Sequence, residues 1–206
     1  MSVDEGQGAL GRGLRRAERW RSSLLLLVLV GFAAYLMSWL WPPVQYFFSG
    51  DEPAALGETG AYKLDEMAHN RYVTITGLPA LKKASYDQLW RSYKVYQLMG
   101  ARVFVRERLL PREAGAGGGE DDGGYQLFYG EGRLLDMRAE PEYGSILEYF
   151  RRHTGFEPEA GPTWVLLQGV RPGDQLLYPV AFGVIALAGL FNLFLLIRRI
   201  FSIGKR

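Results

Sequence analysis

Two long uncharged apolar runs constrain this chain more than any other feature. The second run, LLYPVAFGVIALAGLFNLFLLI, covers 176–197 without a charged residue, and Arg198 and Arg199 follow it directly. A transmembrane helix needs about 20 such residues at a rise of about 1.5 Å each. We therefore predict a transmembrane helix over 176–197 in preference to a buried core helix.

The first run, from Leu24 to about Trp41, has only Ser38 as a polar interruption and leads through WLW into Pro42 and Pro43. Tryptophan is typical of the membrane interface, and the Pro-Pro pair predicts the end of the helix. A signal peptide cleaved near Gly31 and Ala33 is the alternative. Because the apolar run continues past both residues without a polar break, we predict a second retained transmembrane helix over 23–42.

Basic residues flank both runs on their outer sides, and they predict the topology. Positively charged flanks of transmembrane helices stay in the cytoplasm, so the tails 1–22 and 198–206 are predicted there, with 43–175 on the opposite side. The residues that determine this topology are Arg12, Arg15, Arg16, Arg19, Arg21, Arg198 and Arg199. Usage rich in Gly, Ala, Arg and Leu suggests a GC-rich bacterial genome. The predicted location is therefore the bacterial inner membrane, with a periplasmic domain.

Asn192 is the strongly polar residue of the second run. Its amide either bonds a partner helix or reaches the interface, and its place near the end of the run favours the interface.

Between the runs, we predict a polar entry segment over 43–70 and a β-rich domain over 71–175. The alternation of apolar and polar residues, together with the glycine and proline positions, predicts the order of its elements. These are a strand over 71–80, a helical turn near 86–91, a hairpin of 92–99 with 101–109, a flexible loop over 112–124, a hairpin over 125–138 turning at 130–132, a helix over 141–155 and a strand over 163–170. The predicted fold class is thus a membrane protein in which two transmembrane helices flank an α+β domain, either a small antiparallel sheet or an OB-like barrel with one late helix.

The sequence carries no recognisable catalytic or cofactor motif. It contains no cysteine and only two histidines, which argues against a zinc site, and we predict no cofactor and no metal. Asp136, Glu140 and Glu142 are the carboxylates from which an acid/base pair would have to come.

A cluster of aromatic and basic residues is the strongest candidate surface. On a strand, residues 102, 104, 106 and 108 share one face. The candidate interaction patch is Trp90, Tyr93, Tyr96, Arg102, Phe104, Arg106 and Arg108. It is either an ordinary solvated face, a contact for a protein partner or a contact for anionic lipid, and the topology excludes cytoplasmic nucleic acid as a partner.

The layout of one helix, a β-rich domain and a second helix resembles that of the Surfeit-type oxidase assembly factors. The resemblance covers the layout alone: the arginine-glycine-tryptophan strand expected of that family is absent, and WVLLQGVRPGD at 164–174 does not replace it. It therefore implies no site residue here.

These observations predict a non-enzymatic protein that presents a periplasmic interaction domain, as an accessory subunit or assembly factor of an envelope complex. Its predicted partners are the lipid bilayer and another membrane or periplasmic protein. The alternatives are a membrane-anchored enzyme with an envelope substrate, and a sensor of a ligand or of stress.

Overall fold

The structure is a computed structural model that describes residues 4–88, 90–109 and 126–203, with the side chains of 4–20, 22, 202 and 203 left out. The predicted loop over 112–124 and the side chains of Arg12, Arg15, Arg16 and Arg19 lie outside this description. The chain divides into two units, one made of 1–44 with 177–206 and the other of 45–176.

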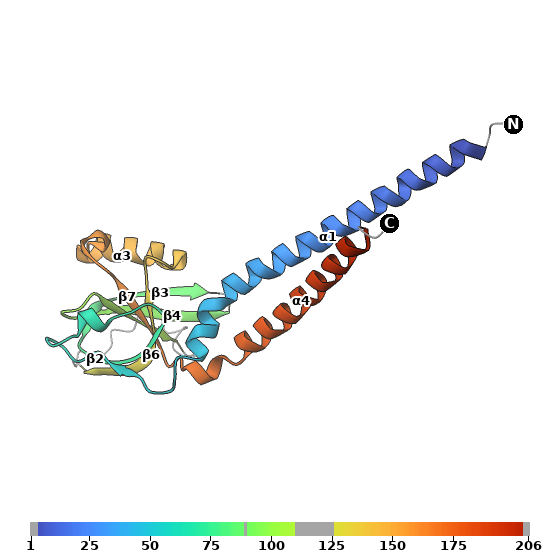
Figure 1. The fold of residues 1–206 in the computed structure, drawn as a ribbon. Helices are drawn as coiled ribbons and strands as arrows, with labels where there is room; N and C mark the ends of the chain where they lie inside the picture. The colour runs from blue at the N-terminus through green and yellow to red at the C-terminus, as the bar shows by residue number, and fades with distance from the viewer. Residues whose placement is uncertain (1–3, 89, 110–125, 204–206) are drawn as a thin grey trace. The chain divides into compact units, whose positions relative to one another are not determined.

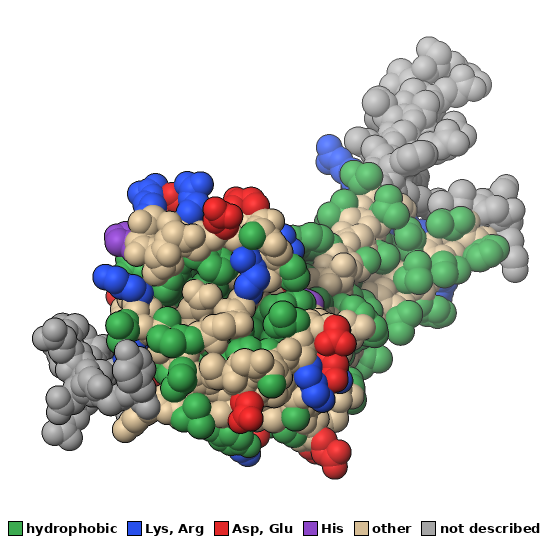
Figure 2. Space-filling model, turned by 90° about the vertical axis from the view of Figure 1, so that its left-hand side faces the viewer, with side chains coloured by type: hydrophobic (Ala, Val, Ile, Leu, Met, Phe, Trp, Pro, Cys, Tyr) green, Lys and Arg blue, Asp and Glu red, His purple; other side chains and the backbone are tan. Residues whose placement is uncertain are grey.

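The first unit consists of long apolar helices, α1 (Asp4–Phe47) and α4 (Leu177–Ile203) (Figure 1). Among the described residues, two segments are long and apolar enough to cross a membrane, namely Ser23–Phe47 and Pro172–Phe201. Of the most apolar stretch of each, only 6% and 0% of the residues are buried. On the face that Figure 2 shows, hydrophobic side chains gather on the described parts of the helices, as membrane insertion requires.

The predicted helix stop at Pro42 and Pro43 is wrong, because α1 continues through both prolines to Phe47. Each proline removes one backbone donor, but a helix persists when the freed carbonyls find other partners. The Trp41 and Phe182 rings lie 5.9 Å apart, and a Cβ on Gly189 would lie 3.2 Å from the Cβ of Ala33. The helices thus pack against each other.

The second unit contains one sheet, whose described residues form seven strands in the order β1-β2-β6-β7-β5-β4-β3. Two neighbouring pairs, β1–β2 and β5–β7, are parallel and the others antiparallel, so the expected purely antiparallel sheet is a mixed one. A parallel pair needs a long crossover, which local alternation in a sequence does not reveal. The strands are β1 (Ala54–Ala55), β2 (Arg71–Gly77), β3 (Pro79–Gln88), β4 (Arg91–Leu98), β5 (Val103–Arg108), β6 (Phe128–Asp136) and β7 (Trp164–Gln168).

The predicted helical turn near 86–91 is wrong. The chain forms a tight hairpin there, in which Gln88 pairs with Arg91 across the turn. The rings of Tyr86 and Tyr93 stack across the two strands at 5.6 Å between centroids. Cross-strand aromatic pairs of this kind stabilise a hairpin.

The predicted hairpin over 125–138 is also wrong, since β6 is one continuous strand through 130–132. Neither Gly130 nor Gly132 has a positive φ. A side chain at Gly130 would meet the Phe128 ring, and one at Gly132 would overlap the Leu167 carbonyl of β7. The glycines therefore provide room for neighbours instead of a turn.

The predicted late helix is confirmed as a short 3₁₀ turn, η2 (Pro141–Tyr143), that leads into α3 (Gly144–Thr154). Its apolar face, Ile146, Leu147 and Phe150, is buried as expected. Gly155 ends α3 with a φ of 68°, a left-handed conformation that glycine adopts at little cost.

Both faces of the sheet are covered. Val73, Val103 and Leu166 belong to a core on one face, to which the entry segment adds Leu56 and Met67. Phe104 and Val165 belong to a second core between the opposite face and α3, which crosses the sheet in Figure 1. The remaining 3₁₀ turns are η1 (Leu64–Glu66), η3 (Pro158–Ala160) and η4 (Pro172–Gln175).

Candidate functional site

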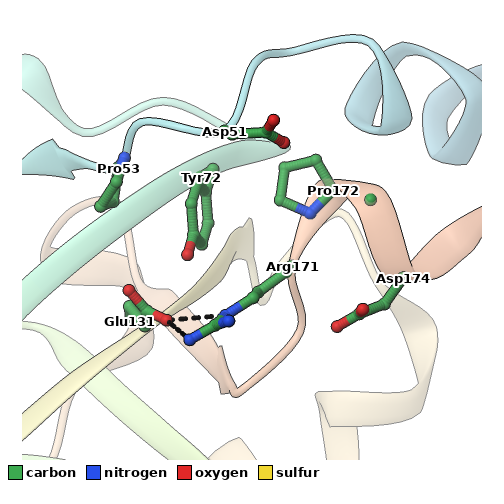
Figure 3. A pocket seen from close by; sticks show the side chains of 8 residues that line it. Asp51, Pro53, Tyr72, Glu131, Arg171, Pro172 and Asp174 are labelled. Atoms are coloured by element: carbon green, nitrogen blue, oxygen red, sulfur yellow. Dashed lines mark hydrogen bonds and ion pairs between the residues drawn. The ribbon is translucent and has the colours of Figure 1, made fainter.

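A pocket of about 350 Å³ opens on the 45–176 unit where β2 and β6 meet the segments that precede α4 and follow α1 (Figure 3). Three separate parts of the chain supply its walls. The lining residues are Asp51, Pro53, Tyr72, Glu131, Arg171, Pro172, Gly173 and Asp174.

An ion pair dominates the pocket. The Nη2 and Nε atoms of Arg171 lie 2.6 and 2.8 Å from the same Glu131 oxygen, shown by the dashed lines in Figure 3. The Arg171 guanidinium carries a positive charge, because arginine stays protonated in proteins. Asp51 and Asp174 bring further negative charge to the walls, so the pocket suits a ligand with a cationic or hydrogen-bond-donating group.

A buried tyrosine beside the pocket joins the two ends of the unit. The Tyr46 hydroxyl, on the last turn of α1, donates to the Val170 carbonyl at 2.6 Å. Tyr46 is fully buried, and this burial raises the pKa of its hydroxyl although the nearby Arg133 opposes the shift. The Arg133 guanidinium lies 4.9 Å from the centre of the Tyr46 ring. The chain therefore enters and leaves this unit at neighbouring points.

The predicted interaction patch is not one surface. Tyr96 and Phe104 are core residues, 5% and 0% exposed, so the prediction that they belong to a surface is wrong. They belong to the cores on opposite faces of the sheet. The alternation of side chains along a strand predicts that Phe104 shares a face with Arg102, Arg106 and Arg108. That alternation does not reveal that α3 covers this face.

Arg102 serves the loop before β7. Its guanidinium donates to the carbonyls of Glu157, Pro158 and Pro162 at 2.6, 3.2 and 3.2 Å. It also lies over the Phe156 ring, 4.6 Å from the centroid. These contacts fix the 156–163 segment against β5 and leave the charge engaged within the domain.

Arg106 is held in a cage of tyrosines at the start of the late helical segment. It donates to Glu142 at 3.1 Å and to the Tyr143 and Tyr86 hydroxyls at 2.8 and 3.3 Å, while its guanidinium lies 4.5 Å from the centre of the Tyr93 ring. Burial raises the pKa of Tyr143, so its hydroxyl stays protonated at neutral pH. Arg106 thus ties α3 to the sheet.

Of the predicted patch, Trp90 and Arg108 remain exposed on the domain surface. Trp90 stands at the tip of the β3–β4 hairpin with 97% of its surface exposed.

The carboxylates considered for acid/base chemistry have separate surroundings. Glu142 accepts from Arg106 and, at 2.5 Å, from the Gln88 amide. Asp136 accepts the backbone N–H of Arg138 at 3.0 Å. In the described contacts, Glu142 and Asp136 share no hydrogen-bond partner.

Sequence reasoning missed the pocket. Its charged residues come from 51, 131 and 171–174, and only the fold brings them together. The sequence RPGD at 171–174 is typical of a turn, but a turn by itself does not predict a ligand site. Comparison with known proteins gives no further assignment: no protein-family model matches the chain, and no significant match is found among curated proteins or solved structures.

Proposed function

We propose that this chain is a two-span protein of a bacterial inner membrane, with both termini in the cytoplasm and the 45–176 unit in the periplasm. In this proposal the unit acts without catalysis as an interaction domain, in an accessory subunit or assembly factor of an envelope complex. The observation that carries the proposal is the hydrogen bond from Tyr46 to Val170. This bond joins the segments through which the domain continues into the two apolar helices. Both helices would therefore enter the membrane from the side on which the domain lies.

The strand order supports a closed domain of the OB-like kind. Leu78 alone separates β2 from β3, yet β2 pairs with β6 and β3 with β4. If β2 and β3 are counted as one bent strand, the order β2-β6-β7-β5-β4-β3 begins and ends on that strand. The sheet is then a ring of five strands. Five strands in a partly open barrel define an OB-like fold, a scaffold whose surface loops serve binding.

The absence of cysteine from the sequence makes the topology directly testable. Single cysteines at Ser2, Glu159 and Ser202 report the two tails and the domain. In intact cells whose outer membrane is permeable to the reagent, an impermeant maleimide is expected to label Glu159→Cys, which is exposed. Ser2→Cys and Ser202→Cys should react only after lysis.

Ala34→Cys is the control within α1. It should resist labelling in membranes and react once the protein is unfolded in detergent, because the thiolate that attacks a maleimide does not form in hydrocarbon. Labelling of the tails but not of Glu159→Cys in intact cells would reverse the proposed orientation.

The interaction role predicts a stable partner. Affinity purification of the full chain in mild detergents is expected to recover a membrane or periplasmic protein in constant ratio to the chain. A variant in which a short linker replaces 54–168 should lose that protein while both helices stay in the membrane. Recovery of a lone monomer across several mild detergents would contradict the proposal.

A further inference from the structure

The tip of the β3–β4 hairpin and the exit of the domain point in the same strand direction. Strand β7 runs parallel to β5, with Leu167 opposite Arg106, and the chain leaves β7 toward α4. Strand β4 runs antiparallel to β5, and β3 antiparallel to β4. The turn between Gln88 and Arg91 therefore lies at the end of the sheet to which the carboxyl end of β7 points. In Figure 1 the arrowhead of β3 marks this end.

A large exposed apolar side chain lies at this end. Trp90 at the tip is 97% exposed. Leu81 is also exposed, but it lies on β3 seven residues before the hairpin turn, about 20 Å along an extended strand. Arg91, next to Trp90, is exposed as well and adds a positive charge.

The two strands next to the turn are held together. The Ser92 hydroxyl donates to the Asp87 carboxylate at 2.6 Å, and the stacked pair of Tyr86 and Tyr93 follows one pleat further in. Full exposure of a large apolar ring such as that of Trp90 in water is unfavourable, so a less polar environment that covers the ring would be favoured.

We propose that this end of the domain docks on the bilayer, with Trp90 inserted among the lipid headgroups beside the transmembrane helices. The proposal rests on the membrane insertion proposed above. Tryptophan and tyrosine are the side chains that prefer the membrane interface, since an apolar ring and a polar N–H or O–H suit its two halves. Arg91 lies where it would meet the lipid phosphates. The domain is then held by the hairpin in addition to its two covalent ends.

Fluorescence quenching in a purified system tests this docking. Arg91→Cys carries a bimane label beside the intact Trp90, in the full chain reconstituted into nanodiscs of phosphatidylcholine and phosphatidylglycerol. Lipids with a nitroxide near the headgroup are expected to quench this label roughly twofold more than a label at Leu81→Cys, the exposed control on the neighbouring strand β3. Adding Trp90→Glu to the Arg91→Cys variant should abolish the difference.

A label at Val184→Cys, on an exposed face of α4, reports insertion itself. If lipid nitroxides quench Val184→Cys while Arg91→Cys matches Leu81→Cys, docking is overturned and insertion stands. If Val184→Cys is also unquenched, the membrane proposal fails with it. A blue-shifted label at Arg91→Cys without lipid quenching would mean burial against protein, which also rejects the lipid contact.

Discussion

Gly132→Ala is expected to prevent stable folding of the 45–176 domain. The added Cβ would overlap the Leu167 carbonyl oxygen and lie 2.8 Å from the Leu167 carbonyl carbon and 3.2 Å from the Gln168 Cα. These are backbone atoms of β7, which pairs with β6 in register at this point, so they cannot rotate away as a side chain would. Overpacking of this kind costs about 3 kcal/mol or more. Thermal unfolding of the purified chain in detergent, followed by near-ultraviolet circular dichroism, measures the loss.

Gly144→Ala is the matched control. Gly144 begins α3 with a φ of −56°, and a Cβ there meets nothing within 4 Å. Alanine lowers the entropy of the unfolded chain and is a better helix former, so this variant should be as stable as the parent or up to about 1 kcal/mol more stable. Equal losses for both variants would show that the close contact between β6 and β7 is not the cause.

Phe104→Ala is expected to cost about 4 kcal/mol of unfolding free energy. The Phe104 ring is fully buried, and its centroid lies 4.8 and 5.1 Å from those of Phe150 and Phe156. Truncation leaves a cavity between the sheet and α3. Trp90→Ala, which removes a larger ring from the exposed hairpin tip, should change stability by no more than about 0.5 kcal/mol.

The same unfolding measurement compares these two variants. Both positions belong to the surface patch predicted from the sequence, so the contrast separates a core residue from a surface residue. Similar losses for the two variants would place Trp90 in a packed contact and would contradict its exposed position.

The apolar helices and α3 were predictable because their signals are local. The length and apolar character of an uncharged run can be read from the run alone. The spacing of Ile146, Leu147 and Phe150, which are buried, likewise lies within one helix. The ends of these elements were less predictable: α1 runs past Pro43, where the sequence indicated a stop.

The errors arose where a distant segment decides the role of a residue. Gly130 and Gly132 resemble a turn until β7 is placed beside them, and β7 begins more than thirty residues later. The even-numbered residues of β5 were assigned to one face correctly, but α3 covers that face. Arg106, whose side chain is 14% exposed, is consequently a partly buried anchor. The pocket was not predicted because Glu131 and Arg171 are forty positions apart.

The contact between Tyr46 and Val170 also gives the domain a geometry suited to insertion into another protein. A module that the chain enters and leaves at neighbouring points can be placed within a surface turn of another protein. The 45–176 unit has this property, since the Tyr46 hydroxyl reaches the Val170 carbonyl. The same property lets a gene gain or lose such a module between two apolar helices while the helices keep their pairing.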